Sequence, residues 1–377
     1  MGAPIRIGID AHMVGSRETG NETYVLGIID GLVSLDVGSE LYVYHAGNSG
    51  EQAGPRVHSR QLLGSGAWSR LTFDLPIRSW TDHLDVIHTT YVAPLWGRCP
   101  VVLTVHDICY ASHPEWFSNR DLRVLSTSVP WSIRRAARVI TVSEVCRAEI
   151  IERYRVPEEK VVCVYNAAGP AAQELNQAEA RDAVSELGID PLRPYILAVG
   201  NLQPRKNLVR LIKAFERLIT EGVDADLVLV GPEHFRSNLV HEAAAGLNAR
   251  VHLTGYLTHR QLAACYQCAA VFAFPSLFEG FGIPALEAMS HGTPVVCAKA
   301  GALPEVCADA AVYFDPLDVE SMADALAHVL TDDTLRAQLA LAGRSRASLF
   351  SWRTAAQETL AVYREAMGRR TSSESAV

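Results

Sequence analysis

Short apolar segments alternate with amphipathic segments along the whole chain of 377 residues. Continuous runs of Val, Ile and Leu indicate strands that are buried on both faces, as in parallel sheets covered by helices. The predicted strands of the first half are residues 5–9, 41–44, 85–88, 101–105, 138–142 and 161–164. Those of the second half are 195–199, 226–230, 250–254, 271–274, 295–298 and 311–314. Their alternation with helical stretches predicts an α/β protein with two Rossmann-like, doubly wound parallel-sheet domains.

The best position for a domain boundary is the segment 166–194, which is rich in Ala, Pro and polar residues and contains no strand pattern. We therefore predict a first domain over residues 1–170, a linker over 171–193 and a second domain over 194–350. A helix over 351–368, which could cross back to the first domain, is expected before a flexible, Ser-rich tail at 369–377. Such domains would face a central cleft at the carboxyl ends of their strands, where ligands of these sheets bind.

Composition narrows the class of protein. Apolar residues make up 49% of the chain and charged residues 20%, which is typical of globular domains. The net charge of -8 argues against nucleic acid as a main partner. The sequence shows no signal-peptide pattern and no apolar run long enough to span a bilayer, so we expect a cytoplasmic protein.

Cys265 and Cys268 lack a second Cys/His pair at zinc spacing and are expected on one face of a helix.

The strongest motif, Phe-Pro-Ser-Leu-Phe-Glu-Gly-Phe-Gly-Ile-Pro-Ala-Leu-Glu, occupies residues 274–287, after a strand and at the start of a helix. Gly280 and Gly282 allow the backbone to approach a ligand, and the helix start offers its amides to an anion. Glu279 and Glu287 could accept hydrogen bonds from hydroxyl groups. Carboxylates beside an anion site suit a sugar attached to phosphate. The alternative is that Glu279 caps the helix and Glu287 lies in solvent.

A second motif, Val-Gly-Asn-Leu-Gln-Pro-Arg-Lys-Asn, follows the first strand of the second half at residues 199–207. Arg205 and Lys206 lie at the start of the next helix, where a cation opposes the helix dipole. A solvated pair is therefore the less favourable interpretation. Two cations beside a helix amino terminus can bind a diphosphate, because Arg binds in a bidentate manner and Lys acts as a point charge.

Together these motifs resemble the retaining, GT-B-fold glycosyltransferases of family four, a group related to bacterial mannosyl- and glucosyltransferases. The resemblance rests on the two motifs and on Leu-Val-Gly-Pro at 229–232 and Gly-Tyr-Leu at 255–257. It implies that Glu279 contacts the donor sugar, that Glu287 contacts the ribose hydroxyls, and that Arg205 and Lys206 bind the diphosphate. Asn201 stands where many members have an Arg. Further donor contacts are assigned to Gly20, Gly231, Tyr256, Leu257, Gly280, Phe281, Gly282 and Ile283.

Signals for the acceptor side, in the first half, are weaker. His106 follows a strand, and the resemblance implies that it reaches the donor sugar, while a packed structural histidine is the alternative. The loop at 15–20 resembles the first loop of the family, but residues 20–24 read Gly-Asn-Glu-Thr-Tyr instead of Gly-x-Gly-Arg-Tyr. Candidates for acceptor contacts are Glu18, His88, Asp107 and Ser143. Ser143 is equally well explained as a helix N-cap.

The resemblance implies metal-independent transfer of a hexose from a nucleoside-diphosphate sugar to a hydroxyl of a glycan, lipid-linked or small-molecule acceptor. No resident cofactor is predicted, and no Asp-x-Asp stands where a metal–diphosphate bridge is expected. The sequence leaves open a nucleotide-sugar epimerase, a sugar-phosphate synthase and a non-catalytic nucleotide-binding subunit. A dehydrogenase is disfavoured, because neither half has Gly-x-Gly-x-x-Gly after its first strand.

Aromatic and basic residues are mixed in the segment 116–138. A basic amphipathic helix can lie on an anionic membrane, which would suit a lipid-linked acceptor and peripheral attachment to the inner face of a membrane. The same charges on a solvated helix face are the alternative interpretation.

Overall fold

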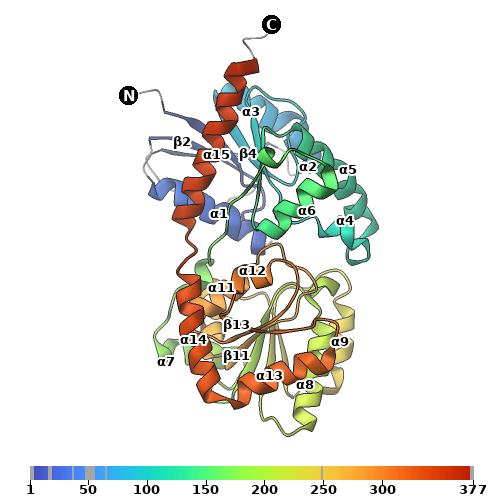
Figure 1. Ribbon diagram of the computed structural model, residues 1–377. Coiled ribbons are helices and arrows are strands. Elements are labelled where there is room, and N and C mark those ends of the chain that lie inside the picture. The colour runs from blue at the N-terminus through green and yellow to red at the C-terminus, as the bar shows by residue number, and fades with distance from the viewer. Residues whose placement is uncertain are drawn as a thin grey trace. The chain divides into compact units, whose positions relative to one another are not determined.

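The computed structural model describes residues 4–15, 19–35, 38–46, 56–63, 66–247 and 249–373. Contacts divide the chain into two compact units (Figure 1). The first unit consists of residues 1–112, 119–166 and 351–377, and the second of 113–118 and 167–350.

The first unit is built on a seven-stranded parallel sheet with the strand order β3-β2-β1-β4-β5-β6-β7. Its strands are β1 Arg6–Asp10, β2 Glu40–His45, β3 Val57–Gln61, β4 Val86–Thr90, β5 Val101–Thr104, β6 Arg138–Thr141 and β7 Val161–Cys163. The order reverses between β1 and β4, as in doubly wound folds. The strand β3 was not predicted, because this half-exposed edge strand reads Val-His-Ser-Arg-Gln and lacks an apolar run.

Helices cover this sheet. They are α1 Thr19–Ser34, α2 Ala67–Ser69, the π-helical turn η1 Arg70–Asp74, α3 Leu75–Thr81, α4 Cys109–Ser112, α5 Asn119–Arg135, α6 Glu144–Tyr154, the 3₁₀ turn η3 Glu158–Lys160, and α15 Trp352–Ser373. The last of these, red in Figure 1, packs against α1. A Cβ on Gly27 would lie 2.2 Å from the Trp352 ring, so a residue without a side chain lets α1 and α15 approach closely. The helix continues to Ser373, into the segment expected as a tail.

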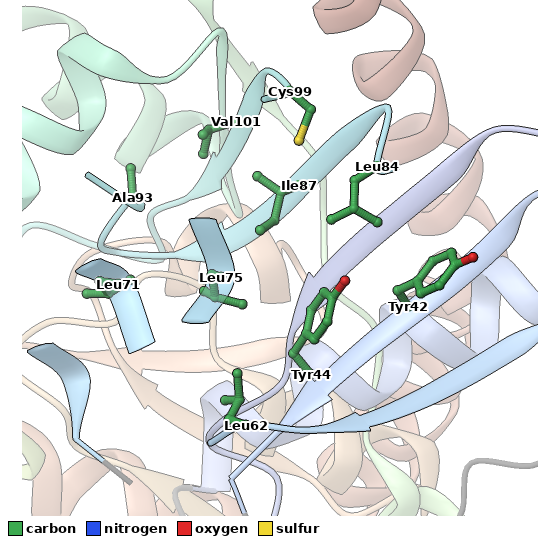
Figure 2. Close-up of a cluster of buried hydrophobic side chains, with 10 residues drawn as sticks. All are labelled: Tyr42, Tyr44, Leu62, Leu71, Leu75, Leu84, Ile87, Ala93, Cys99 and Val101. Atoms are coloured by element: carbon green, nitrogen blue, oxygen red, sulfur yellow. The ribbon is translucent and has the colours of Figure 1, made fainter. Parts of the chain in front are cut away.

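A compact cluster of apolar side chains joins the sheet of the first unit to the helices after β3 (Figure 2). Tyr44 on β2 and Ile87 on β4 face Leu71 on η1 and Leu75 on α3. All four side chains are buried. This cluster fixes the inner side of the segment 67–81 on the sheet.

The second unit contains a six-stranded parallel sheet with the order β10-β9-β8-β11-β12-β13, which is the Rossmann order. Its strands are β8 Tyr195–Val199, β9 Asp226–Val230, β10 Val251–Gly255, β11 Val271–Phe274, β12 Val295–Ala298 and β13 Ala311–Phe314. All six were predicted, to within one residue at each end, because each is a continuous apolar run. The prediction of two doubly wound parallel-sheet domains is therefore confirmed.

The helical elements of this unit are η2 Pro114–Trp116, η4 Pro170–Ala172, α7 Gln177–Glu186, η5 Pro204–Lys206, α8 Leu208–Thr220, α9 Asn238–Ala244, η6 Ala245–Leu247, α10 His259–Cys268, α11 Ile283–Ser290, α12 Leu303–Cys307, α13 Val319–Thr331 and α14 Asp333–Ala347. On α8, apolar side chains recur at the helical period and are buried, as amphipathic helices require. Part of the expected linker forms α7, which packs against α10. Cys265 and Cys268 are free thiols on α10, the predicted location in a helix.

Candidate functional site

Two loops meet at the switch point of the second sheet, where β8 and β11 are neighbours. The first loop follows β8 and contains η5, and the second follows β11. They are joined by backbone and side-chain hydrogen bonds: Leu277 N donates to Arg205 O at 2.8 Å, and Asn207 Nδ2 donates to Pro275 O at 3.0 Å. Ligands of doubly wound sheets bind at this position. The two motifs identified in the sequence therefore form one local structure.

Glu279 lies between two cations in this structure. Lys206 Nζ donates to Glu279 Oε1 at 2.6 Å, and Arg205 Nη1 donates to Glu279 Oε2 at 3.0 Å. Glu279 and Lys206 are buried, and the Lys206 ammonium lies 5.1 Å from the centre of the Phe274 ring. Burial alone would raise the pKa of Glu279, but Arg205 and Lys206 lower it to about 2. Glu279 is therefore ionised at neutral pH and paired with two cations.

The backbone of Glu279 is held by the turn that leads into α12. Ala302 N donates to Glu279 O at 2.9 Å. Gly301 has a φ of +53°, and a Cβ at this position would lie 2.5 Å from Glu279 O and 2.8 Å from Glu279 N. Only glycine fits at this contact without a shift of the backbone.

Glu287 lies inside α11, which begins after Gly282, a residue in the left-handed conformation. Its side chain is buried and accepts a hydrogen bond from the Tyr266 hydroxyl at 3.0 Å. Burial raises the pKa of Glu287 to about 7, although the Tyr266 hydroxyl and the Gly169 amide oppose the increase. The alternative of a solvated Glu287 is thus wrong. The alternative of a capping Glu279 is also wrong, because Gly282 is the N-cap of α11 and no side chain caps it.

The other donor candidates of this unit lie in the same set of loops or beside it. Gly280, Phe281 and Gly282 are buried between Glu279 and α11, which starts at Ile283. Gly231, after β9, donates its amide to Gly255 O at 2.9 Å, so the loop after β9 is joined to the end of β10 at the carboxyl edge of the sheet. In the loop after β10, Tyr256 is partly exposed and Leu257 is buried.

In the first unit, His106 follows β5 and its ring lies edge-on to Tyr24, with 4.7 Å between ring centroids. Burial lowers the pKa of His106 to about 4, although nearby Asp107 opposes the decrease, so the ring is neutral at pH 7. Its Nε2 is inaccessible to solvent and has no hydrogen-bond partner among the described residues. A buried nitrogen in this state could accept or donate one bond to a ligand.

Structural contacts occupy three of the acceptor candidates. His88 is buried in β4, and its two ring nitrogens bind the Tyr363 hydroxyl at 2.6 Å and Thr104 Oγ1 at 2.7 Å. Ser143 is the N-cap of α6, with its Oγ accepting from Cys146 N at 3.2 Å. Asp107 Oδ1 accepts from Cys109 N at 3.1 Å. In the first loop, the donor candidate Gly20 lies exposed in the first turn of α1, and the acceptor candidate Glu18 lies outside the described residues.

A buried ion pair at the carboxyl end of β1 was not predicted from the sequence. Arg70 Nη1 on η1 lies 3.3 Å from Asp10 Oδ2, and His12 Nδ1 lies 3.0 Å from Asp10 Oδ1. Burial raises the pKa of Asp10 to about 6, and Arg70 opposes the increase. The sequence did contain one indication of Asp10, namely an acidic residue at the end of an apolar strand. Arg70 gave none, because it lies sixty residues further along the chain.

The basic segment 116–138 is not a single helix. Trp116 belongs to η2, α5 begins at Asn119, and Arg138 starts β6, where its guanidinium lies 3.0 Å from Glu365. The arginines that are exposed lie on α5, namely Arg120, Arg123, Arg134 and Arg135. Arg138 therefore does not belong to an exposed basic face. No helix among the described residues is both long and apolar enough to cross a membrane.

Comparison with known proteins agrees with the motifs. The family model described as "Glycosyl transferases group 1" matches residues 180–346, and "Glycosyltransferase Family 4" matches residues 19–171. The chain is 30% identical over 266 residues to O-antigen chain mannosyltransferase B of Escherichia coli, which covers 70% of both chains. It is 29% identical over 324 residues to the MMP alpha-(1->4)-mannosyltransferase of Mycolicibacterium hassiacum, covering 83% of this chain and 71% of that one.

Solved structures share the fold. Sucrose-phosphate synthase from Thermosynechococcus elongatus superimposes with a TM-score of 0.79 at 19% identity, covering 97% of this chain and 100% of that one. At this identity the similarity shows a common architecture of two Rossmann-like domains.

Proposed function

The chain belongs to the family 4 glycosyltransferases of GT-B fold, and from this we propose that it transfers mannose, with retention and without a metal ion, from a nucleoside diphosphate to a hydroxyl acceptor. The observation that carries the proposal is the cluster of Arg205, Lys206 and Glu279 at the switch point of the second sheet. Mannose is preferred over glucose because the two relatives described above are mannosyltransferases by name.

The charges of the cluster suit a diphosphate leaving group. Two cations face one carboxylate, so the cluster as a whole is positive and would attract an anion. Negative charge accumulates on the diphosphate as the bond to the sugar breaks. Cations that are already held in place stabilise that charge without reorganisation, which is commonly a large part of catalysis. We assign this role to Arg205 and Lys206.

Glu279 and Glu287 would bind the donor at two points. Glu279, ionised and fixed by its cations, would accept hydrogen bonds from sugar hydroxyls. Glu287 would accept them from the ribose hydroxyls once its carboxyl group is ionised. His106, neutral and with Nε2 available, would add a hydrogen bond to the donor sugar. Each contact orients the donor for attack at the anomeric carbon.

Retention fits a direct, front-face reaction. The bond between the anomeric carbon and the diphosphate oxygen breaks, the bond to the acceptor oxygen forms on the same face, and the acceptor proton passes to the departing diphosphate. This route needs no protein nucleophile. A pKa of about 2 makes Glu279 a weak base, which supports a binding role for this carboxylate.

The test combines donor binding with transfer. Thermal shift against GDP-, UDP- and ADP-sugars should show selective stabilisation by a mannose donor, because a bound ligand raises stability by mass action. With that donor, Lys206→Ala and Glu279→Ala should each reduce transfer about 100-fold or more. NMR of the product should show the anomeric configuration of the donor.

Matched controls lie on α8. Lys213 and Glu216 are exposed there, so Lys213→Ala and Glu216→Ala should leave transfer unchanged. Transfer close to that of the unmodified enzyme in folded Lys206→Ala and Glu279→Ala would refute the site. An inverted product would refute retention alone.

A further inference from the structure

The segment 67–81, which comprises α2, η1 and α3, has one buried and one exposed side. Its inner side packs on the sheet through Leu71 and Leu75 (Figure 2) and is tied to β1 by the Arg70–Asp10 ion pair. Its outer side carries Trp68, Phe73, Ile77 and Trp80. Trp68 is 74% exposed, Phe73 56% and Trp80 54%, which is unusual for side chains of this size.

The π-helical turn helps to place these side chains on a common side. Trp68 and Phe73 are five residues apart, a spacing that an ordinary α-helix places on different faces. In a π turn, the hydrogen bond spans five residues, so this spacing is close to one turn. Phe73, Ile77 and Trp80 then follow at the ordinary helical spacings of four and three. The outer side is consequently a continuous apolar stripe.

The loop after β4 widens the stripe. Leu95 N donates to Leu71 O at 3.0 Å, and Trp96 Nε1 donates to Thr72 O at 2.8 Å, so this loop lies along η1. Leu95 and Trp96 are themselves exposed. We call the surface of Trp68, Phe73, Ile77, Trp80, Leu95 and Trp96 the aromatic face. It holds three of the six tryptophans of the chain, so the enrichment is specific to this surface.

Charges around the aromatic face are of one sign. The acidic residues of the segment 56–100 are Asp74, Asp82 and Asp85, and all three are buried or half-buried where the structure describes this segment. The cation beside the face is Arg98, whose guanidinium lies 6.0 Å from the centre of the Trp80 ring, whereas Arg78 on α3 is paired with Asp74 at 3.5 Å. An apolar surface edged by Arg98, with no exposed carboxylate among the described residues of the segment 56–100, complements anionic lipid headgroups.

We propose that the aromatic face inserts into the interfacial layer of a bilayer that contains anionic lipids. Trp side chains favour this layer, where the apolar ring is buried and the indole N–H can stay hydrated, and Phe73 would add buried apolar area. A second copy of the chain fits less well, because a symmetric contact would bring Arg98 of both copies together with no exposed acid among the described residues of the segment 56–100 to compensate. The segment 116–138 is the weaker membrane candidate, since Val124 and Trp131 are the large apolar side chains exposed on α5.

Vesicle flotation tests the proposal. The protein should bind phosphatidylcholine vesicles that contain phosphatidylglycerol, and brominated lipid should quench its tryptophan fluorescence. The triple variant Trp68→Ser/Phe73→Ser/Trp80→Ser should bind at least about tenfold more weakly, because it removes most of the inserted apolar area. Arg98→Gln should weaken binding about fivefold, and only for the anionic vesicles.

The matched control is Val124→Ser/Trp131→Ser on α5, which should bind vesicles as the unmodified protein does. Circular dichroism and thermal unfolding check that the triple variant is folded. Absence of vesicle binding, or equal binding by the triple variant, overturns the proposal. Sedimentation velocity gives a further test. If vesicle binding is absent and the protein self-associates, and if the triple variant loses this self-association, the proposal is overturned and the partner of the aromatic face is a second copy of the chain.

Discussion

Glu279 and Glu287 belong to the same loop and helix and are equally buried, with 7% and 6% of each residue exposed, yet their ionisation differs. The pKa of Glu279 is lowered to about 2, and that of Glu287 is raised to about 7. Desolvation acts on both groups in the same direction. The difference comes from their partners, because Glu279 has two cations and Glu287 has a hydroxyl group and a backbone amide.

The carboxyl groups of Glu279 and Glu287 would therefore be in different protonation states when a ligand reaches the candidate donor site. The region around Glu279 is permanently charged and already has its hydrogen bonds arranged. The region around Glu287 is close to protonation equilibrium at neutral pH, so a ligand that donates hydrogen bonds to its carboxylate would also favour ionisation. Stability and pH dependence can therefore separate the two regions without a transfer assay.

The largest expected effect is on the free energy of unfolding, which should respond differently when the charge of Glu279 or that of Glu287 is removed. Glu279→Gln leaves the buried Lys206 and the half-buried Arg205 without their carboxylate, which should cost about 3–5 kcal/mol of unfolding free energy. Glu287→Gln removes a carboxylate with no cationic partner among the described residues and should be neutral or stabilising at pH 8. Urea unfolding of both variants measures this. Equal losses in the two variants would contradict the comparison.

The second largest effect concerns pH, because Glu287 and Glu279 should make the free energy of unfolding depend on pH in opposite directions. The ordinary pKa of a glutamate is 4.5, so an unfolded Glu287 ionises while the folded group stays protonated up to about pH 7. Stability should fall by about 3 kcal/mol at most as the pH rises from 4.5 to 7, and this fall should be smaller in Glu287→Gln. For Glu279 the sign is reversed, and stability is lost as the pH falls from 4.5 towards 2.

Urea unfolding of the unmodified protein and of Glu287→Gln at pH 5 and pH 7.5 checks the first part. The difference between the two proteins isolates Glu287 from Asp10, whose raised pKa acts in the same direction. A difference that does not change with pH would mean that Glu287 is ionised throughout this range.

The smallest effect sharpens the role of the backbone beneath Glu279. Gly301→Ala places a Cβ against Glu279 O and N and should shift this residue while leaving Glu287 in place. Gly222→Ala is the control, because Gly222 also has a positive φ but has nothing within 4 Å of its Cβ position. Gly301→Ala should be less stable than the control by about 2 kcal/mol and should bind donor more weakly. Equal behaviour of the two variants would show that backbone strain alone matters.

The second unit was predictable because its features are local in sequence. Each strand is a continuous apolar run, and the motifs of Lys206 and Glu279 follow strands that are neighbours at the switch point. The resemblance to a family then supplied the roles of these residues. The burial of Glu287 could not be predicted, since it depends on Tyr266 and Gly169, which reach α11 through the tertiary fold.

In the first unit, several features have no local pattern. The polar edge strand β3 carries no apolar run, and the Asp10–Arg70 pair joins residues far apart in the chain. The π turn η1 changes the helical period, so the apolar residues of the segment 67–81 fit neither a helix nor a strand template. The acceptor candidates were chosen by position alone, and the structure shows that several of them have structural partners.

The contact between α15 and α1 has a consequence for the order in which the protein is made. Because α15 follows residue 350, the whole second unit is synthesised between the first sheet and the helix that completes it. A growing chain therefore leaves the ribosome with the surface around Gly27 uncovered until Trp352 has emerged. The second unit, which is continuous apart from residues 113–118, can finish folding before that time. The part of the protein that is translated first is thus the part that is completed last.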